Sequence, residues 1–413
     1  MLHKTIALFA LFLTFQRLAA QEKLSIDKVY SVTLRNSGTI IENEQIKGYY
    51  FFYQSDKIDK KTNEYTLQLA DANLNKIKDI KFSDSKDIAL LESSYNGSSI
   101  MFMFYDDKEN MLDYRLYNMD GTKSFTYSKS LDKRSEQYFK QARTNMNNGE
   151  ESENSNAFDI SGKGFLSILP LRENKNYTYE VNFYASDKRK TWTYNPIEDG
   201  KYAMAQYLGA NDSIAIIEVL SREKMMSKEM ESTLVGINLQ TGRKAFETRT
   251  QDKQYQLYPM NISVVKEGNL LIGPYFEGDD RVMQDNSQGI GIWLMNNQGK
   301  IIKSKYSSWS KDLSKFVKVD SKGRVENLGY LFIHNMMQTE DGKFFAIAEG
   351  YKKTANAGGI AMSILTQSYS SNVTKLVVTD MLMLEMNDKF EITNAKVYEK
   401  NNNSFSLPGA DFA

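Results

Sequence analysis

Hydrophobic and polar positions along the chain repeat one pattern six times. A turn leads into a short apolar run, a polar loop follows, and an alternating run, a second turn and a third run complete the copy. The second copy is the clearest: an apolar run over Ser98–Tyr105, an alternating run over Leu112–Tyr117, and the turn Asn118-Met-Asp-Gly121. Period-two alternation predicts strands, and a turn ending in Gly predicts a hairpin because such turns need positive φ.

A fourth strand precedes the first turn of each copy, as in Ile88–Ser93 and Tyr330–Met336. Four antiparallel strands per unit, repeated about every 40–50 residues, are typical of β-propeller blades. The pattern therefore predicts an all-β chain, a β-propeller of about six four-stranded blades. A large sandwich and an irregular β-solenoid are the alternatives. The predicted repeat units are residues 39–82, 87–127, 157–194, 202–248, 260–306 and 329–398.

The second turns give the register, at Asp71, Asn118, Ala185, Asn238, Asn296 and Glu385. Two long intervals in this register contain insertions, at residues 131–156, 307–328 and 353–372. Leu131–Met146 and Ser307–Val319 predict short helices. The strand predicted over Lys28–Leu34 belongs to no unit, and Phe405–Ala413 shows no convincing strand. Either the early strand closes the ring or a seventh blade is incomplete.

The first twenty residues have the pattern of a signal peptide. Lys4 is followed by an apolar core over Thr5–Phe15, and Leu18-Ala-Ala20 forms a small-residue cleavage site before Gln21. We expect residues 21–413 to form one exported domain that is periplasmic, on the outer surface or extracellular. The sequence predicts no membrane span, and no cysteine follows the signal to carry a lipid anchor.

Charge and cysteine content narrow the class of partner. Lysine plus arginine and aspartate plus glutamate each number 52, and the chain has no cysteine. A balanced charge without a basic stripe argues against nucleic acid as a partner. Disulfide bonds are excluded, but a chain of this length buries enough apolar surface to fold without them.

Histidine is scarce as well, because only His3 and His334 occur. A Cys/His zinc site and a cysteine nucleophile are therefore excluded, and a Ser-His-Asp triad could use only His334 after signal removal. His334 lies in an apolar strand, which favours a structural role. No phosphate-binding glycine-rich loop follows a strand, so no cofactor is expected.

Carboxylate chemistry remains open, since a glycosidase needs only two acids placed by the fold. Glu349 is the leading candidate, because it ends the apolar strand Phe344–Ala348 and could face the central channel. A solvated strand-end acid is the alternative. Other acids lie in loops, where solvation is the default and calcium binding lacks a supporting motif: Asp106, Asp107, Glu277, Asp279 and Asp280.

The segment Ala185–Trp192 resembles the Asp-box of sialidase-type propellers, Ser-x-Asp-x-Gly-x-Thr-Trp. Asp187, Thr191 and Trp192 match, whereas Ala185 and Arg189 depart from the pattern. In that family the box lies in an outer turn of a blade, far from the catalytic centre. The resemblance therefore implies blade topology and no catalytic residue.

The segment Gly329–Lys352 resembles the most recognisable stretch of a family of exported bacterial proteins of unknown function with propeller-like repeats. The resemblance implies no activity, but it makes His334, Glu349 and their strands the first place to examine.

These observations favour a non-catalytic binding module for a protein, peptide or glycan. The alternative is a glycan-active hydrolase that uses carboxylates of the central funnel, such as Glu349. The small apolar insertion Thr354–Gln367 is a further candidate binding surface. The sequence predicts neither a metal site nor the oligomeric state.

Overall fold

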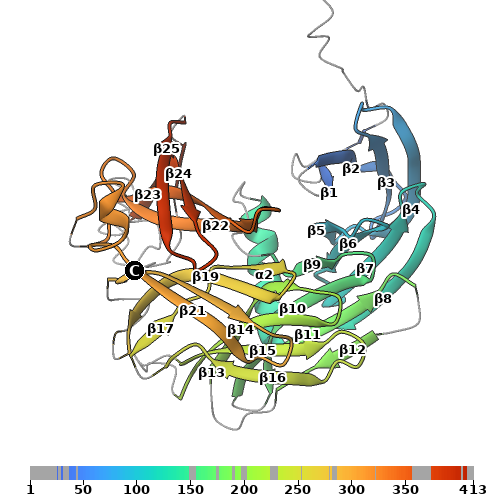
Figure 1. The fold of residues 1–413 in the computed structure, drawn as a ribbon. Helices are drawn as coiled ribbons and strands as arrows, with labels where there is room; N and C mark the ends of the chain where they lie inside the picture. The colour runs from blue at the N-terminus through green and yellow to red at the C-terminus, as the bar shows by residue number, and fades with distance from the viewer. Residues whose placement is uncertain are drawn as a thin grey trace, which may run out of the picture. The chain divides into compact units, whose positions relative to one another are not determined.

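A computed structural model describes most of the chain from residue 37 onward (Figure 1). The described residues are 26, 29–30, 37–42, 45–147, 155–173, 176–187, 191–196, 202–223, 231–252, 254–278, 280, 286–320, 322–355, 374–400 and 403–406. The expected signal peptide, residues 356–372 of the third insertion, Arg189 and Asp279 lie outside them. Of the strand expected over Lys28–Leu34, only Val29 and Tyr30 are described, and neither is in a strand.

The described elements are almost all strands, arranged as antiparallel sheets that follow one another in chain order. Each group of four consecutive strands is paired in simple up-and-down order, which is the topology of a propeller blade. The prediction of an all-β propeller fold with about six four-stranded blades is confirmed. The chain divides into two compact units, residues 1–167 with 184–191, and residues 168–183 with 192–413.

The first unit contains two complete blades. One has the order β1-β2-β3-β4 and the other β5-β6-β7-β8. Helix α2 (Lys133–Asn147) and strand β9 (Ala157–Ile160) follow. The strand bounds are β1 (Ser37–Glu42), β2 (Gln45–Lys57), β3 (Thr62–Asp71), β4 (Lys76–Ser85), β5 (Ile88–Tyr95), β6 (Ser99–Asp106), β7 (Met111–Asn118) and β8 (Lys123–Ser130).

The third group of strands is divided between the two units. It comprises β9, β10 (Gly164–Glu173), β11 (Asn176–Ala185) and β12 (Thr191–Tyr194). Strand β9 pairs with the first residues of β10, and β12 pairs with β11. A single parallel bridge between Tyr177 and Tyr202 links β11 to the next blade.

The second unit contains three further blades, which run from yellow-green to red in Figure 1. The fourth and sixth have continuous first strands, whereas the first strand of the fifth is broken into β17 and β18, which both pair with β19. The bounds are β13 (Tyr202–Ala210), β14 (Ile214–Arg222), β15 (Glu231–Asn238), β16 (Lys244–Arg249), β17 (Tyr255–Leu257), β18 (Asn261–Val265), β19 (Gly268–Glu277), β20 (Gly289–Met295), β21 (Ile301–Ser308), β22 (Tyr330–Gln338), β23 (Phe344–Ala355), β24 (Thr374–Met386), β25 (Ile392–Tyr398) and β26 (Asn403–Ser406).

The hydrophobic core lies between the faces of successive blades. In the first unit, side chains such as Phe52 and Leu67 pack against Phe102 and Phe104 of the next blade. In the second unit, Ile216 packs in a cluster with Trp293, and another cluster joins the fifth and sixth blades. The alternating apolar positions of each strand therefore face a neighbouring blade, as period-two patterning requires.

The outer turns of the first, second, fifth and sixth blades share one hydrogen-bonding pattern. The N–H of Asn296 donates to the carbonyl of Lys300, and the N–H of Gly299 donates back to the carbonyl of Asn296. The fourth residue of this turn has positive φ, as at Leu74, Gly121 and Gly299. In the sixth blade the equivalent pair is Asn387 and Phe390. The register predicted at Glu385 is therefore wrong by two residues, because Phe390 (φ 62°) replaces the expected glycine.

Outer strands pack against the outer turn of the following blade. A Cβ atom on Gly299 would lie 2.4 Å from Cδ2 of Phe246, which belongs to β16 of the preceding blade. Gly242 meets the ring of Trp192 in the same way, and Lys303 lies over the ring of Phe390 at 4.4 Å. Close approach and positive φ together require glycine at Gly242 and Gly299, whereas Leu74 and the buried Phe390 occupy the corresponding position of the first and sixth blades.

This packing explains the Asp-box resemblance. Trp192 stacks on Phe183 with ring centroids 5.3 Å apart, and its indole N–H donates to the carbonyl of Leu239 at 2.9 Å. Trp192, the last residue of the box, therefore joins its blade to the next one; residues 188–190 of the box lie outside the described residues. Asp187 lies at the start of the turn that follows β11.

The helical insertions form in part. Helix α2 confirms the helix expected over Leu131–Met146: Asp132 accepts from the N–H of Ser135 at 2.8 Å, and Phe139 is fully buried. The second insertion contains only a short 3₁₀ turn, η2 (Leu313–Lys315). At the other end, β26 pairs with Lys375–Val378 of β24 and includes Phe405 and Ser406; the rest of the segment expected to lack a strand lies outside the described residues.

Candidate binding site

The two residues proposed for catalysis are brought together in the sixth blade. Nε2 of His334 on β22 donates to Oε2 of Glu349 on β23 at 3.0 Å. The side chain of Lys400, which follows β25, pairs with the other oxygen of Glu349. The backbone N–H of Lys400 donates to Oδ1 of Asp380 at 3.1 Å. Both carboxylates therefore hold Lys400, which lies between β25 and β26 along the edge of β24.

The local electrostatics also fit a structural role for His334. A register shift in β22 between Ile333 and Asn335 places His334 at a bulge, where its ring meets Phe332 edge-on at 5.0 Å. Partial burial, and then the positive charge of Lys400, lower the pKa of the imidazole. Glu349 therefore has both carboxylate oxygens engaged, one by the imidazole of His334 and the other by the side chain of Lys400. The catalytic assignment of Glu349 and His334 stays a prediction.

The remaining acids considered from the sequence hold turns or the helix. Oδ1 of Asp106 accepts from the N–H of Lys108, and Asp107 lies 3.4 Å from Nη1 of Arg143 on α2. Asp280 closes a turn by accepting from the N–H of Glu277 at 2.9 Å. Across the described ranges, no three His, Asp or Glu side chains are grouped to hold a metal ion.

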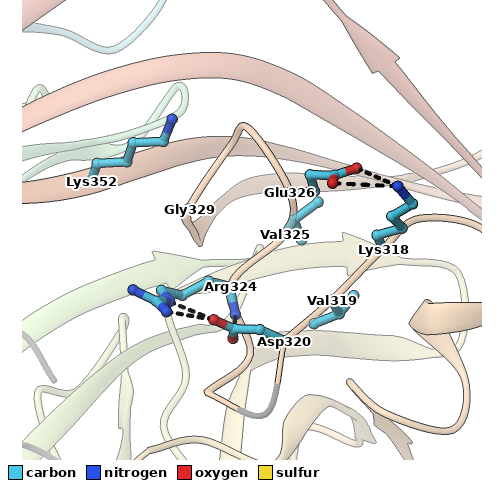
Figure 2. Close-up of a pocket in the computed structure, with 8 residues that line it drawn as sticks. All are labelled: Lys318, Val319, Asp320, Arg324, Val325, Glu326, Gly329 and Lys352. Atoms are coloured by element: carbon cyan, nitrogen blue, oxygen red, sulfur yellow. Dashed lines mark hydrogen bonds and ion pairs between the residues drawn. The ribbon is translucent and has the colours of Figure 1, made fainter.

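A cavity of about 440 Å³ lies between the second insertion and β23 of the sixth blade. Its wall is a hairpin over residues 318–329, and its far side is the end of β23 (Figure 2). Val319 and Val325 form a β-bridge within the hairpin, and Val325 forms another with Gly329. The lining residues are Lys318, Val319, Asp320, Arg324, Val325, Glu326, Gly329 and Lys352. This volume lies in the range of small-ligand sites, about 300–1,000 Å³.

The hairpin is anchored firmly at its base. Val325 and Leu328 are buried in the core shared by the fifth and sixth blades. Oγ1 of Thr379 donates to the carbonyl of Leu328 at 2.7 Å, and a Cβ on Gly350 would meet the side chain of Leu328 at 2.6 Å. At the tip, Gly323 packs against the ring of Trp309. The cavity wall is therefore held in place before any ligand binds.

Charges around the cavity are mostly paired. Lys318 lies 3.2 Å from Glu326, and Arg324 lies 2.6 Å from Asp320. The Asp320 pair is part of the hairpin turn, because Asp320 also accepts from the backbone N–H of Arg324 at 2.9 Å, and these bonds lower its pKa. Lys352 is exposed and makes no ion pair within the described ranges, and Figure 2 shows it apart from both pairs.

The sequence marked this insertion but missed the site. Residues 307–328 stood outside the repeat, which is where function is commonly added to a repeat scaffold. The approach of Lys352 to Gly329 across the pairing of β22 and β23 carries no local signal. Gly329 is the one residue of the site whose type reflects this approach. Its φ is 92°, and a Cβ atom there would lie 2.2 Å from the carbonyl oxygen of Tyr351.

One family model matches the whole chain. Its description is "Family of unknown function (DUF6770)", and it covers residues 1–413. No match was found among curated proteins. Within the described residues, no helix is long and apolar enough to cross a membrane.

Several solved structures are similar at low identity. A dipeptidyl peptidase 4 from Porphyromonas gingivalis is 10% identical with a TM-score of 0.41, over 91% of this chain and 55% of that one. A putative dipeptidyl aminopeptidase IV from Bacteroides ovatus is 10% identical with a TM-score of 0.39, over 79% of this chain and 47% of that one. A subtype N10 neuraminidase-like protein of A/little yellow-shouldered bat/Guatemala is 8% identical with a TM-score of 0.33, over 78% and 83%. The chain thus spans about half the length of the two peptidases, and none of these similarities assigns it an activity.

Proposed function

Because the chain belongs to the family of unknown function DUF6770, as the resemblance over Gly329–Lys352 predicted, we propose its role from its own geometry. It is a non-catalytic module that binds a peptide or a segment of a partner protein in the cavity beside the 318–329 hairpin. The carrying observation is a cavity of about 440 Å³ built by an insertion that the blade repeat does not need.

Three features support binding rather than catalysis. The hairpin is anchored through Leu328 and Trp309, so the cavity is preorganised and little ordering is required on binding. Both cavity carboxylates, Asp320 and Glu326, are paired with cations on the same hairpin. Each carboxylate therefore has an oxygen engaged by a cation, which makes it a poor candidate for proton transfer to a ligand.

The alternative function, a glycan-active hydrolase, is less well supported because its leading candidate, Glu349, is bound by two other side chains. A glycosidase needs a carboxylate free to protonate or attack the sugar, with a second about 5–10 Å away. Glu349 has one oxygen on Lys400 and the other on His334, so it would need to break an ion pair before acting. Hydrolysis of a probe by the protein would contradict the proposal.

Export is part of the same proposal. The first twenty residues predict removal of a signal peptide before Gln21. Amino-terminal sequencing of the protein recovered from outside the cytoplasm would then begin at Gln21. Recovery of the protein only from the cytoplasm, starting at Met1, would contradict this part.

The test is a screen of the full chain against a tetrapeptide library and a glycan array. The variant Glu326→Trp places a bulky ring in the cavity at an exposed position, where loss of the Lys318 pair costs less than about 1 kcal/mol. Lys322→Trp lies on the same hairpin, is exposed and does not line the cavity, so it is the matched control. We expect peptides that bind the wild type and Lys322→Trp but not Glu326→Trp.

Three results would contradict the proposal. Probes that bind Glu326→Trp as well as the wild type would place binding elsewhere on the chain. Glycans alone on the list of bound probes would overturn the peptide class. Hydrolysis of a bound probe, checked by mass spectrometry, would show an enzyme.

A further inference from the structure

We infer that the hairpin cavity recognises the terminal carboxylate of a peptide through Lys352, with the last aliphatic side chain against Val319 and Val325. This inference rests on the proposed function and names the chemistry of its ligand. It follows from the charge, the donors and the surface that the lining residues present.

The charge of the cavity favours one anionic group. Five of its eight lining residues are charged, three positively and two negatively. Lys318 with Glu326 and Arg324 with Asp320 form two ion pairs of 3.2 and 2.6 Å. Among the residues that the structure describes, Lys352 has no charged counterpart, so this lining attracts an anion and disfavours a cation.

The available donors suit a carboxylate. The ammonium of Lys352 offers three N–H donors. Arg324 spends its Nε–H and one Nη2–H on Asp320 and retains further guanidinium donors. A monocarboxylate matches the single uncompensated charge, whereas a phosphate of about −1.5 to −2 would leave charge unbalanced.

The uncharged part of the lining suits an aliphatic residue. Val319 and Val325 both line the cavity; Val319 is half-buried and offers most of the apolar contact, whereas Val325 is 3% exposed and largely enclosed by the core. None of the eight lining residues is aromatic. Sugar rings bind best on aromatic faces, so a peptide end fits this cavity better than an acidic sugar.

The experiment compares matched probes on the full chain. N-acetylated tetrapeptides ending in valine, leucine or alanine are prepared as free acids and as carboxyl-terminal amides, and a galacturonate trisaccharide is the third arm. Isothermal titration measures affinity for the wild type, Lys352→Met, Lys322→Met and Glu326→Trp. Circular dichroism and thermal melts confirm that each variant is folded.

We expect at least one acid probe to bind the wild type about tenfold more tightly than its amide, the effect of one charge-assisted hydrogen bond. Lys352→Met should weaken the acid about tenfold and leave the amide unchanged, whereas Lys322→Met should change neither. Glu326→Trp should weaken both acid and amide.

Other outcomes overturn the inference in distinguishable ways. Acid and amide that bind the wild type equally, but lose affinity in Glu326→Trp, would refute the carboxylate while the proposed function stands. Trisaccharide binding with no peptide binding would refute the peptide. Peptide binding that Glu326→Trp leaves intact would refute the cavity itself and the proposed function with it, as would the absence of binding in all three arms.

Discussion

Replacing Glu218 with glutamine should remove a pH dependence from the stability of the second unit. Glu218 lies on β14 and is fully buried between the fourth and fifth blades. Its Oε1 accepts from Oγ of Ser232 at 2.6 Å, and its Oε2 has no hydrogen-bond partner in the described residues. The charge of Glu218 also acts on Tyr258: burial is the larger cause that raises the pKa of Tyr258, and the charge of Glu218 is the second.

The magnitude follows from the shift in pKa. Burial raises the pKa of the Glu218 carboxyl from 4.5 to about 7, and the Ser232 hydroxyl opposes this only in part. At pH values between 4.5 and about 7, the carboxyl of Glu218 is protonated in the folded chain and ionised in the unfolded chain. Stability from the protonated acid is therefore fully present below pH 4.5 and is lost as the pH rises through 7. The difference corresponds to about 3 kcal/mol.

The assay is urea unfolding at pH 5, 6, 7 and 8, followed by tryptophan fluorescence. All three tryptophans, Trp192, Trp293 and Trp309, belong to the second unit, so the signal reports on that unit alone. The wild type should lose stability from pH 5 to 8. Glu218→Gln, neutral and of the same shape, should show a flatter profile and exceed the wild type by up to about 3 kcal/mol at pH 8.

The control is Glu247→Gln, an exposed acid on β16 of the same blade that pairs with Lys244. It should keep the wild-type profile and change stability by less than about 1 kcal/mol. The reasoning about Glu218 is refuted by a Glu218→Gln profile that slopes as steeply as the wild type.

Three further variants test the packing described above. Gly299→Ala should lower the free energy of unfolding by about 3 kcal/mol, because it adds positive-φ strain and a clash with Phe246. The control is Gly342→Ala, at φ 82° with open space around it, which should lower the free energy of unfolding by only about 1 kcal/mol. Equal losses for the two variants in urea unfolding would contradict the contact between the blades. Lys400→Met should raise the pKa of His334, since the charge of Lys400 now lowers it; an imidazole NMR titration checks this, Lys352→Met is the control, and an unchanged pKa would disprove the coupling. Glu92→Gln should lower the free energy of unfolding by about 2 kcal/mol and speed amide hydrogen exchange in β9, because the carboxylate of Glu92 accepts from the N–H groups of Asn156 and Ala157. The control is Glu109→Gln, in an exposed loop. Exchange in β9 of Glu92→Gln that is no faster than in this control would contradict the prediction.

Local signals in the sequence predicted the blades well. The turn at Asn118–Gly121 could be located because positive φ and tight hairpins demand particular residues, and that demand is local. Where a buried Phe390 took the place of glycine, the same rule failed and the register was displaced. Tertiary packing compensated for strain that sequence reasoning assumes to be forbidden.

The binding site could be predicted only in part. The insertion at 307–328 was visible as a break in the repeat, but its cavity depends on the approach of Lys352 to Gly329, which strand pairing alone creates. Glu218 and Glu92 were also missed, because a polar residue in an alternating strand normally predicts a solvated face. Their burial depends on which blade covers that face, and no local pattern records it.

The most direct test of the binding site is a crystal structure of the full chain with the tightest tetrapeptide acid. We predict peptide density in the cavity, with its terminal carboxylate within hydrogen-bond distance of Nζ of Lys352 and its last side chain against Val319 and Val325. Density at any other place on the chain, with this cavity free of peptide, would contradict the account.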